Sequence, residues 1–258
     1  MGRSYAEPGI RVGIDPYRSL RGTGFRPGAT FLMQERPRSI TTTCKDVLRK
    51  FIPDFLLKER SIVLRLGPGA GRIYTRLRLN DAIGLRASNR RLVPPSARSF
   101  VFVCFGNIMR SAIAEFLMSQ ALNESGLEKQ VRIISAGLHA TGGSEAHLWA
   151  QEASEDLGIA LSQHRAKPLT REMVEQADCI LAMDFQNKAE LLNLYPESQA
   201  KIYMLSAYAE GPWKYREIPD PYLGDLETTR FCARQIQICI RNLMISIFPS
   251  STYSCSRT

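Results

Sequence analysis

The stretch FVFVCFGNIMRSAIAEFLM, residues 100–118, decides the predicted fold. An apolar run ends at Cys104, a short loop contains Gly106 and Asn107, and Arg110 and Ser111 open a segment typical of a helix. This order predicts a buried strand, a loop and a helix start. A buried structural cysteine is the simplest alternative, so the remainder of the chain has to distinguish the two interpretations.

Apolar runs and helical periodicities alternate along the chain after this stretch. The pattern predicts strands at 99–104, 131–137, 180–184 and 201–208. It predicts helices at 111–126, 146–158, 170–179, 185–196 and 226–248. Strands that alternate with helices favour a parallel sheet covered on both faces. We therefore expect an α/β fold with three layers, α-β-α, around a central and mainly parallel four-stranded sheet.

The net charge is concentrated in the first third of the 258-residue chain. Residues 1–97 contain 19 basic and 7 acidic residues, a balance of +12, whereas the remainder has a balance of −3. This division predicts a basic extension over 1–97, a domain over 98–250 and a short tail over 251–258.

The sequence of the basic extension predicts a partly disordered and partly helical segment. Residues 1–40 are rich in Gly, Pro, Arg and Ser and have little periodicity, which is typical of disorder. Residues 44–66 and 71–86 have apolar residues at roughly helical spacing, which predicts one or two basic amphipathic helices. GPGAG at 67–71 lacks the Lys-Ser/Thr of a nucleotide loop, so we interpret it as a plain turn. LVPPSARS at 92–99 indicates a linker.

Composition limits the compartment and the partners. Six cysteines without a Cys-x-x-Cys pair or zinc-type spacing indicate reduced thiols, a cytoplasmic location and no metal or other cofactor. We find no apolar run near the roughly 18 residues of a membrane span, and no apolar core of a secretory signal in residues 1–20. The basic extension could contact nucleic acid, anionic lipid or a partner, but a solvated arginine-rich face is the favoured interpretation.

The loop after Cys104 has the composition of an anion site. Backbone N–H groups of a short loop and the free N–H groups at a helix start can converge on one phosphate. Gly106 would allow unusual backbone angles or close approach, and Asn107 tolerates a left-handed conformation. Such a site favours a thiolate at Cys104, while Arg110 can bind two phosphate oxygens and Ser111 can donate to the sulfur.

These residues resemble a known family. CFGNIMRS matches the Cys-x-Gly-Asn-x-x-Arg-Ser signature of the low-molecular-weight protein tyrosine phosphatases. RIISAG, QHRAKPLT, ADCILAMDFQN and IPDPYLGD follow in the order and approximate spacing of that family. The resemblance covers roughly residues 99–248 and nothing in 1–97. It implies a phosphate-binding loop that also includes Phe105, Ile108 and Met109.

The resemblance implies a phosphatase with a phosphocysteine intermediate. Cys104 would be the nucleophile, Arg110 the phosphate clamp, and Asp220 of PDPY the general acid and base. The chemistry needs such a carboxyl group, because an expelled phenoxide must gain a proton. The substrate would be a phosphotyrosine protein or a small aryl phosphate.

Supporting roles also follow from the resemblance. It implies a hydrogen-bonded bracing network and an aromatic wall of the substrate cleft at Tyr222. The network would comprise Asn107, Ser111, Ser135 and His164. Asp178 and Asp184 are interpreted as structural.

The chain departs from the family pattern at several positions. Met109 stands where the family often has a second loop cysteine, so we expect no protective disulfide with Cys104. Ala112 replaces a proline that is merely favoured in the first helical turn. Leu138, His139 and Leu223 differ at positions that bear on substrate choice.

Three other classes of protein share part of this pattern. A thioredoxin-linked arsenate reductase needs two relay cysteines after the 180–184 strand, which are absent there, and Cys232 and Cys239 share one face of the last helix as core residues do. The larger tyrosine phosphatases are excluded, because Val103 and not His precedes Cys104 and the acid lies downstream. In a scaffold module that binds phosphate without turnover, Cys104 would have no catalytic role.

Overall fold

The computed structural model describes residues 54–86 and 89–249. The helices and strands follow in the order α2 (Asp54–Ala82), β1 (Ser99–Cys104), α3 (Arg110–Glu124), β2 (Arg132–Gly137), α4 (Leu148–Glu155), α5 (Arg171–Gln176), β3 (Cys179–Ala182), α6 (Phe185–Leu194), β4 (Ile202–Met204) and α7 (Leu226–Ile247). Short 3-10 helices at Pro196–Lys201, Leu205–Tyr208 and Gly211–Trp213 flank β4. The predictions for residues 1–53 and for the tail lie outside the described residues.

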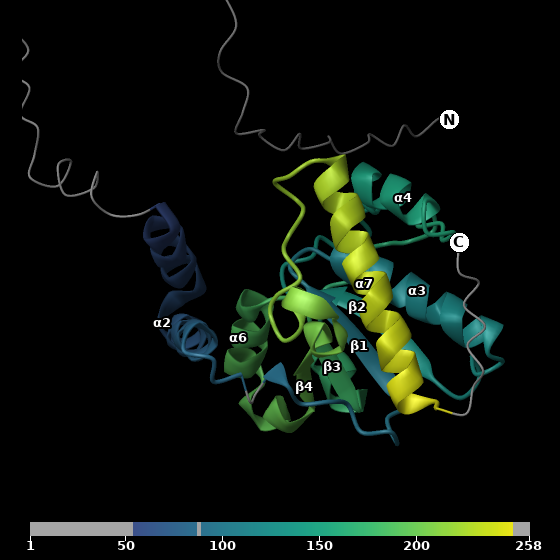
Figure 1. The fold of residues 1–258 in the computed structure, drawn as a ribbon, viewed down its shortest axis with the longest axis horizontal. Helices are drawn as coiled ribbons and strands as arrows, with labels where there is room; N and C mark the ends of the chain where they lie inside the picture. The colour runs from purple at the N-terminus through teal and green to yellow at the C-terminus, as the bar shows by residue number, and fades with distance from the viewer. Residues whose placement is uncertain (1–53, 87–88, 250–258) are drawn as a thin grey trace, which may run out of the picture. The chain divides into compact units, whose positions relative to one another are not determined.

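The sheet has four parallel strands in the order β2-β1-β3-β4 (Figure 1). β1 lies between two neighbours, and Phe100 pairs with Ile133 on one side and with Cys179 on the other. Parallel neighbours need crossover connections, which here contain the helices. The predicted four-stranded parallel sheet is confirmed.

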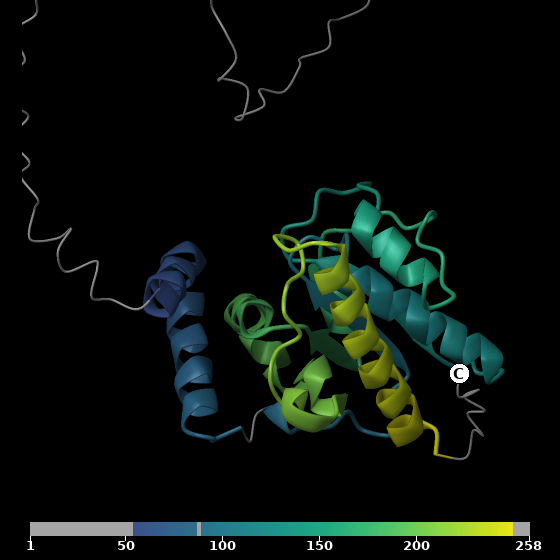
Figure 2. The ribbon, with the colours of Figure 1, turned by 45° about the horizontal axis from the view of Figure 1, so that its top comes forward.

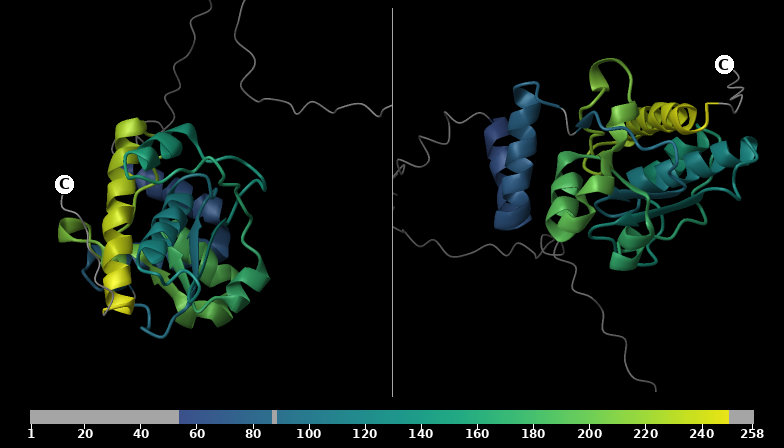
Figure 3. Two further views of the ribbon diagram at one scale, coloured as in Figure 1. Left: turned by 90° about the vertical axis from the view of Figure 1, so that its right-hand side faces the viewer. Right: turned by 90° about the horizontal axis from the view of Figure 1, so that it is seen from below.

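Alternate residues of β1 face two separate cores. Phe100 and Phe102 pack in a cluster with residues of α3, α4 and α7, whereas Val101 and Val103 pack with residues of α5, α6 and α2. All four side chains are fully buried, as expected for a strand covered on both faces. Figure 3 shows helices on both sides of the strands, so the three-layer α-β-α arrangement is also confirmed.

β4 is shorter than the strand predicted over 201–208. It covers Ile202–Met204, and the chain then forms the 3-10 helix Leu205–Tyr208. The reason lies in a later loop: the carbonyl of Ser206 accepts from Tyr215 N at 3.0 Å, and its hydroxyl donates to the carbonyl of Arg216. Ser206 therefore holds the loop that leads to residue 220 instead of continuing the sheet.

α2 consists of two helical segments that meet at a kink at Gly67, whose φ of 72° and ψ of 179° are not helical, and the two segments contact each other through Tyr74 and Glu59. Glycine adopts such a φ without the steric penalty of a side chain, and Pro68 then suits the first turn of the following segment. The turn predicted over 67–71 is therefore present at Gly67, and residues 68–71 belong to the second helical segment.

α2 packs against α6, as Figures 1 and 2 show. Ile62, Tyr74 and Leu77 of α2 are buried in one cluster with Phe185 and Leu191 of α6. The segment after α2 is also fixed, because Val93 is buried and its N–H donates to the hydroxyl of Tyr208 at 2.8 Å. The described residues, 54–86 and 89–249, belong to one compact unit. Among the described helices, none has the length and apolar character needed to cross a membrane.

Candidate active site

Cys104 ends β1, and α3 begins six residues later at Arg110. The Cys104 sulfur is buried, accepts from the N–H of Asn107 at 3.2 Å, and lies 3.0 Å from the hydroxyl of Ser111. The first N–H groups of α3 have no acceptor within the helix, and Met109 at the N-cap supplies none from its side chain. The strand, loop and helix start predicted from residues 100–118 are confirmed, and they form a cradle of N–H groups beside a thiol.

Asn107 is the hub of the loop. Its φ is 54°, the left-handed conformation expected for it, and its side chain is fully buried. The amide Nδ2 donates to the hydroxyls of Ser111 at 2.9 Å and Ser135 at 2.8 Å. Its Oδ1 accepts from Lys167 N at 2.8 Å, and its backbone carbonyl lies 2.6 Å from Nε2 of His164. The structure therefore brings together the four residues named for the bracing network.

Gly137, the glycine of RIISAG, allows the loop to approach β2. A Cβ added to Gly137 would lie 2.8 Å from Asn107 N and from the carbonyl carbon of Gly106, which is closer than side-chain carbons come to backbone. Gly106 itself has no positive φ, and its added Cβ would meet only the Ile108 side chain, at 3.6 Å. The unusual backbone angle that Gly106 would allow is therefore not used, because Asn107 takes the left-handed conformation and Gly137 makes the close contact with the loop.

Arg110 is buried below the cleft between two carboxylates. Its NH1 group donates to Asp184 Oδ2 at 2.6 Å and to the carbonyl of Ile218 at 3.1 Å, and its NH2 group lies 2.8 Å from Asp220 Oδ2. Burial lowers the pKa of the guanidinium, but Asp184 and Asp220 outweigh that effect, so the pKa of Arg110 is raised. Arg110 is therefore a permanent cation with a fixed orientation.

Asp220 lies at the mouth of the same cleft. Its side chain is 46% exposed, and its Oδ1 accepts from Tyr222 N at 3.2 Å. The cleft has a cavity volume of about 360 Å³. Its lining comprises Cys104, Phe105, Gly106, Ile108, Met109, Arg110, His139, Thr141, Ser144, Glu145, His147, Asp220 and Tyr222. The structure thus brings the predicted nucleophile, clamp, acid and cleft wall to one cavity.

Aromatic rings line both sides of this cleft. His139 stacks on Phe105 with centroids 4.5 Å apart, and its Nε2 lies 2.6 Å from Glu190 Oε2. His147 meets Tyr222 edge to face at 5.8 Å. Leu223, which follows Tyr222, is 94% exposed and does not line the cavity.

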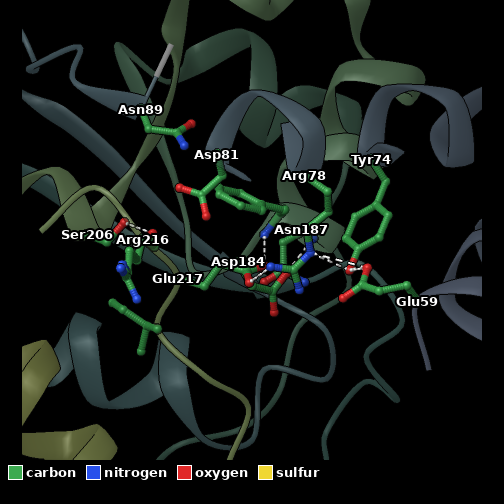
Figure 4. Close-up of polar contacts among 12 residues, drawn as sticks. Glu59, Tyr74, Arg78, Asp81, Asn89, Asp184, Asn187, Ser206, Arg216 and Glu217 are labelled. Carbon is green, nitrogen blue, oxygen red and sulfur yellow. Dashed lines mark hydrogen bonds and ion pairs between the residues drawn. The ribbon is translucent and has the colours of Figure 1, made fainter. Parts of the chain in front are cut away.

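Several residues of the site were not predicted from the sequence. Asp184, interpreted only as structural, caps α6 by accepting from Asn187 N at 2.7 Å (Figure 4), and it also pairs with Arg110. Its place just after β3, beside β1 in the sheet, is the signal that could have revealed it. Thr141, Ser144, Glu145 and His147 also line the cavity, and no sequence pattern marks any of them. Asp178 holds the backbone N–H groups of Arg98 and Ser99, which confirms its structural role.

The other described cysteines do not form a relay. Cys232 and Cys239 are fully buried in α7, and burial raises the pKa of each thiol to about 12. Cys179 is buried in β3, and burial raises its pKa as well. These thiols do not suit the exchange chemistry of an arsenate reductase, which needs accessible thiolates. Within residues 54–86 and 89–249, no cluster of His, Cys, Asp and Glu could hold a metal ion.

Comparison with known proteins agrees with this geometry. The family model described as low molecular weight phosphotyrosine protein phosphatase matches residues 99–250. The chain is 34% identical to the low molecular weight protein-tyrosine-phosphatase Ptp of Acinetobacter johnsonii, with 55% of this chain and 93% of that protein covered. It is 33% identical to the protein-arginine-phosphatase of Bacillus subtilis, with 55% and 92% covered.

Comparison with a solved structure indicates the same family. The low molecular weight protein tyrosine phosphatase from T. tengcongensis aligns with a TM-score of 0.53 and 32% identity, over 58% of this chain and 99% of that chain. The matched region begins at β1 and contains the loop, the cleft and the Asp220 segment, whereas α2 lies outside the family match. Since the family match covers more than half of the sequence, this chain belongs to the low molecular weight phosphotyrosine protein phosphatase family.

Proposed function

We propose that this chain hydrolyses phosphotyrosine on proteins, together with small aryl phosphates, and that residues 98–250 are its catalytic domain. The observation that supports this most directly is the placement of Cys104, Arg110 and Asp220 around one cleft, at the N-terminus of α3. A cytoplasmic location is part of the proposal, because Cys104, Cys179, Cys232 and Cys239 are all unpaired thiols.

In the first step, the thiolate of Cys104 attacks phosphorus while the bond from phosphorus to the phenolic oxygen breaks. The N–H of Asn107 and the hydroxyl of Ser111 interact favourably with negative charge on the sulfur. Arg110 and the N–H groups of the loop stabilise the charge on the transferring phosphoryl oxygens. Asp220, at the mouth of the cleft, donates the proton that the leaving phenoxide gains.

In the second step, water attacks the phosphocysteine and the sulfur–phosphorus bond breaks. Asp220 takes the proton from that water, and inorganic phosphate leaves with the thiolate restored. The hydroxyl of Ser111 accompanies both steps, because it lies 3.0 Å from the sulfur that first attacks and then departs. No proton passes through the bracing network in this scheme: Asn107, Ser135 and His164 only fix the loop.

The walls of the cleft support an aryl ester as substrate. Phe105, Ile108, His147 and Tyr222 line the cavity with aromatic and aliphatic surface above the phosphate loop. A phenyl ring gains stacking and edge-to-face contacts with such walls. Phosphoarginine is the informative competitor, since one relative is named a protein-arginine-phosphatase.

The test compares turnover of p-nitrophenyl phosphate, a phosphotyrosine peptide and a phosphoarginine peptide by the wild type, Cys104→Ser and Asp220→Asn. We expect turnover of both aryl esters, loss of turnover in Cys104→Ser, and a kcat lower by about 10²- to 10⁴-fold in Asp220→Asn. Equal rates for the wild type and Cys104→Ser would exclude catalysis through this thiol and favour a binding module. Preferential turnover of phosphoarginine would overturn the proposed substrate class.

A further inference from the structure

Arg78 of α2 connects the helix outside the family match to the segment that precedes Asp220. Its NH1 group lies 2.6 Å from Glu217 Oε2, and its Nε donates to the hydroxyl of Tyr74 at 2.8 Å and lies 3.3 Å from Glu59 Oε2 (Figure 4). The hydroxyl of Tyr74 in turn donates to Glu59 at 2.7 Å. The guanidinium also lies over the ring of Phe185, 5.3 Å from its centroid. Contacts with residues of α2 and of α6 therefore fix the orientation of the Arg78 side chain.

Glu217 joins this arginine to the site. Its Oε1 accepts from the N–H of Phe185, the first residue of α6, at 2.8 Å, while its other oxygen binds Arg78. Ile218 follows directly, donates its N–H to the carbonyl of Met183 at 2.9 Å and accepts from Arg110. Asp220 is two residues further. The Glu217 side chain thus binds the segment just before Asp220, the proposed general acid, to the start of α6.

The charges in this cluster depend on Arg78. Burial raises the pKa of Glu217, the Arg78 cation opposes this, and the nearby Asp184 carboxylate raises it further. Without Arg78, the Glu217 carboxylate would lose its cation while the repulsion from Asp184, which keeps Arg110, remained. Removing Arg78 would thus weaken the hold on the Glu217–Asp220 segment through repulsion as well as through the lost contact.

We propose that Arg78 is a positioning residue for catalysis: through Glu217 it holds the segment that places Asp220 beside Arg110, in the cleft that Cys104 also lines. The inference rests on the proposed role of Asp220 and assigns to α2 a part in turnover. A general acid must lie within hydrogen-bonding reach of the leaving oxygen, so a displacement of about 1 Å can lower the rate by up to about 10²-fold.

The experiment measures kcat and KM of full-length variants with p-nitrophenyl phosphate and with phenyl phosphate. Phenoxide is the poorer leaving group, so a displaced acid slows phenyl phosphate more. We expect Arg78→Ala to lower kcat by about tenfold or more for phenyl phosphate and less for p-nitrophenyl phosphate, with KM little changed. Arg78→Lys should restore most of kcat. Arg76→Ala, which removes an exposed cation from the same helix, is the matched control and should behave as the wild type.

The same substitution made in the Asp220→Asn variant distinguishes the positioning role of Arg78 from the proposed function. In Asp220→Asn, Arg78→Ala should cause no further loss of kcat, because the acid that it positions is already absent. Equal losses in both backgrounds, equal losses with both substrates, or an unchanged kcat in Arg78→Ala would each overturn the positioning role. Asp220→Asn alone tests the general acid: wild-type turnover by that variant would refute the proposed function and the inference with it. Glu217→Gln, which keeps an acceptor for the Phe185 N–H, should reproduce the Arg78→Ala losses if the latter variant is unstable.

Discussion

The buried ion pair between Arg110 and Asp184 gives a quantitative prediction for Asp184→Asn. Both side chains are at least nine-tenths buried, and the pair is 2.6 Å long. Losing one partner of a buried pair destabilises a protein by about 3–5 kcal/mol when the other charge is left alone. Here Arg110 keeps Asp220 and the carbonyl of Ile218, so the loss is closer to that of one charge-assisted hydrogen bond, about 2–3 kcal/mol. For a unit of this size, Tm should fall by about 5–10 °C.

The assay is thermal and urea unfolding at pH 7.5 without phosphate. Asp225→Asn is the matched control, because Asp225 caps α7 as Asp184 caps α6 but forms no ion pair with an arginine of residues 54–86 and 89–249. Aspartate and asparagine are nearly equal as N-caps, so the control should leave stability almost unchanged. A shift in Asp184→Asn no larger than in Asp225→Asn would refute the reasoning, since the Arg110 pair would then add nothing.

Three further predictions concern Gly137, Lys188 and Met109. Gly137→Ala should lower kcat/KM for p-nitrophenyl phosphate by about 10-fold or more, because the new Cβ would meet the loop backbone at 2.8 Å; Gly142→Ala, whose nearest contact is a proline carbon at 3.6 Å, is the control and should be neutral. Burial lowers the pKa of Lys188 from 10.5 to about 8, so the unfolded chain binds more protons between these values and stability should rise with pH across that window; urea unfolding of Lys188→Met should lack this rise. Peroxide-inactivated enzyme should stay inactive after dithiothreitol treatment, whereas Met109→Cys should recover activity through a disulfide with Cys104; full recovery of the wild type would contradict this expectation.

Local patterns were enough to predict the centre of the molecule. The apolar run in residues 99–104, with the strands and helices that alternate after it, predicted a strand buried on both faces, and the next six residues predicted an anion loop at its end. Asn107 takes the predicted left-handed conformation. These features depend on neighbours in sequence, which is why the sequence alone revealed them. The role of Gly137 emerged only from the pairing of β1 with β2, which brings the loop against it.

Other features depend on contacts across the fold that no local pattern encodes. Asp184 reaches Arg110 because β3 happens to lie beside β1, and Glu217 reaches Arg78 across more than half of the chain. The apolar side of α2 predicted an amphipathic helix but not that α6 covers it. Likewise, β4 ends early because Ser206 holds a loop that follows it.

The packing of α2 on α6 also has a consequence for the growing chain. About a hundred residues separate the two helices in sequence, so at 5–20 residues per second α2 leaves the ribosome about 5–20 s before α6. During that interval Ile62, Tyr74 and Leu77 have no α6 surface to cover them. A nascent chain of this protein therefore presents the uncovered apolar side of α2 early in synthesis. Slower translation of the region between α2 and α6 should increase its demand for chaperones.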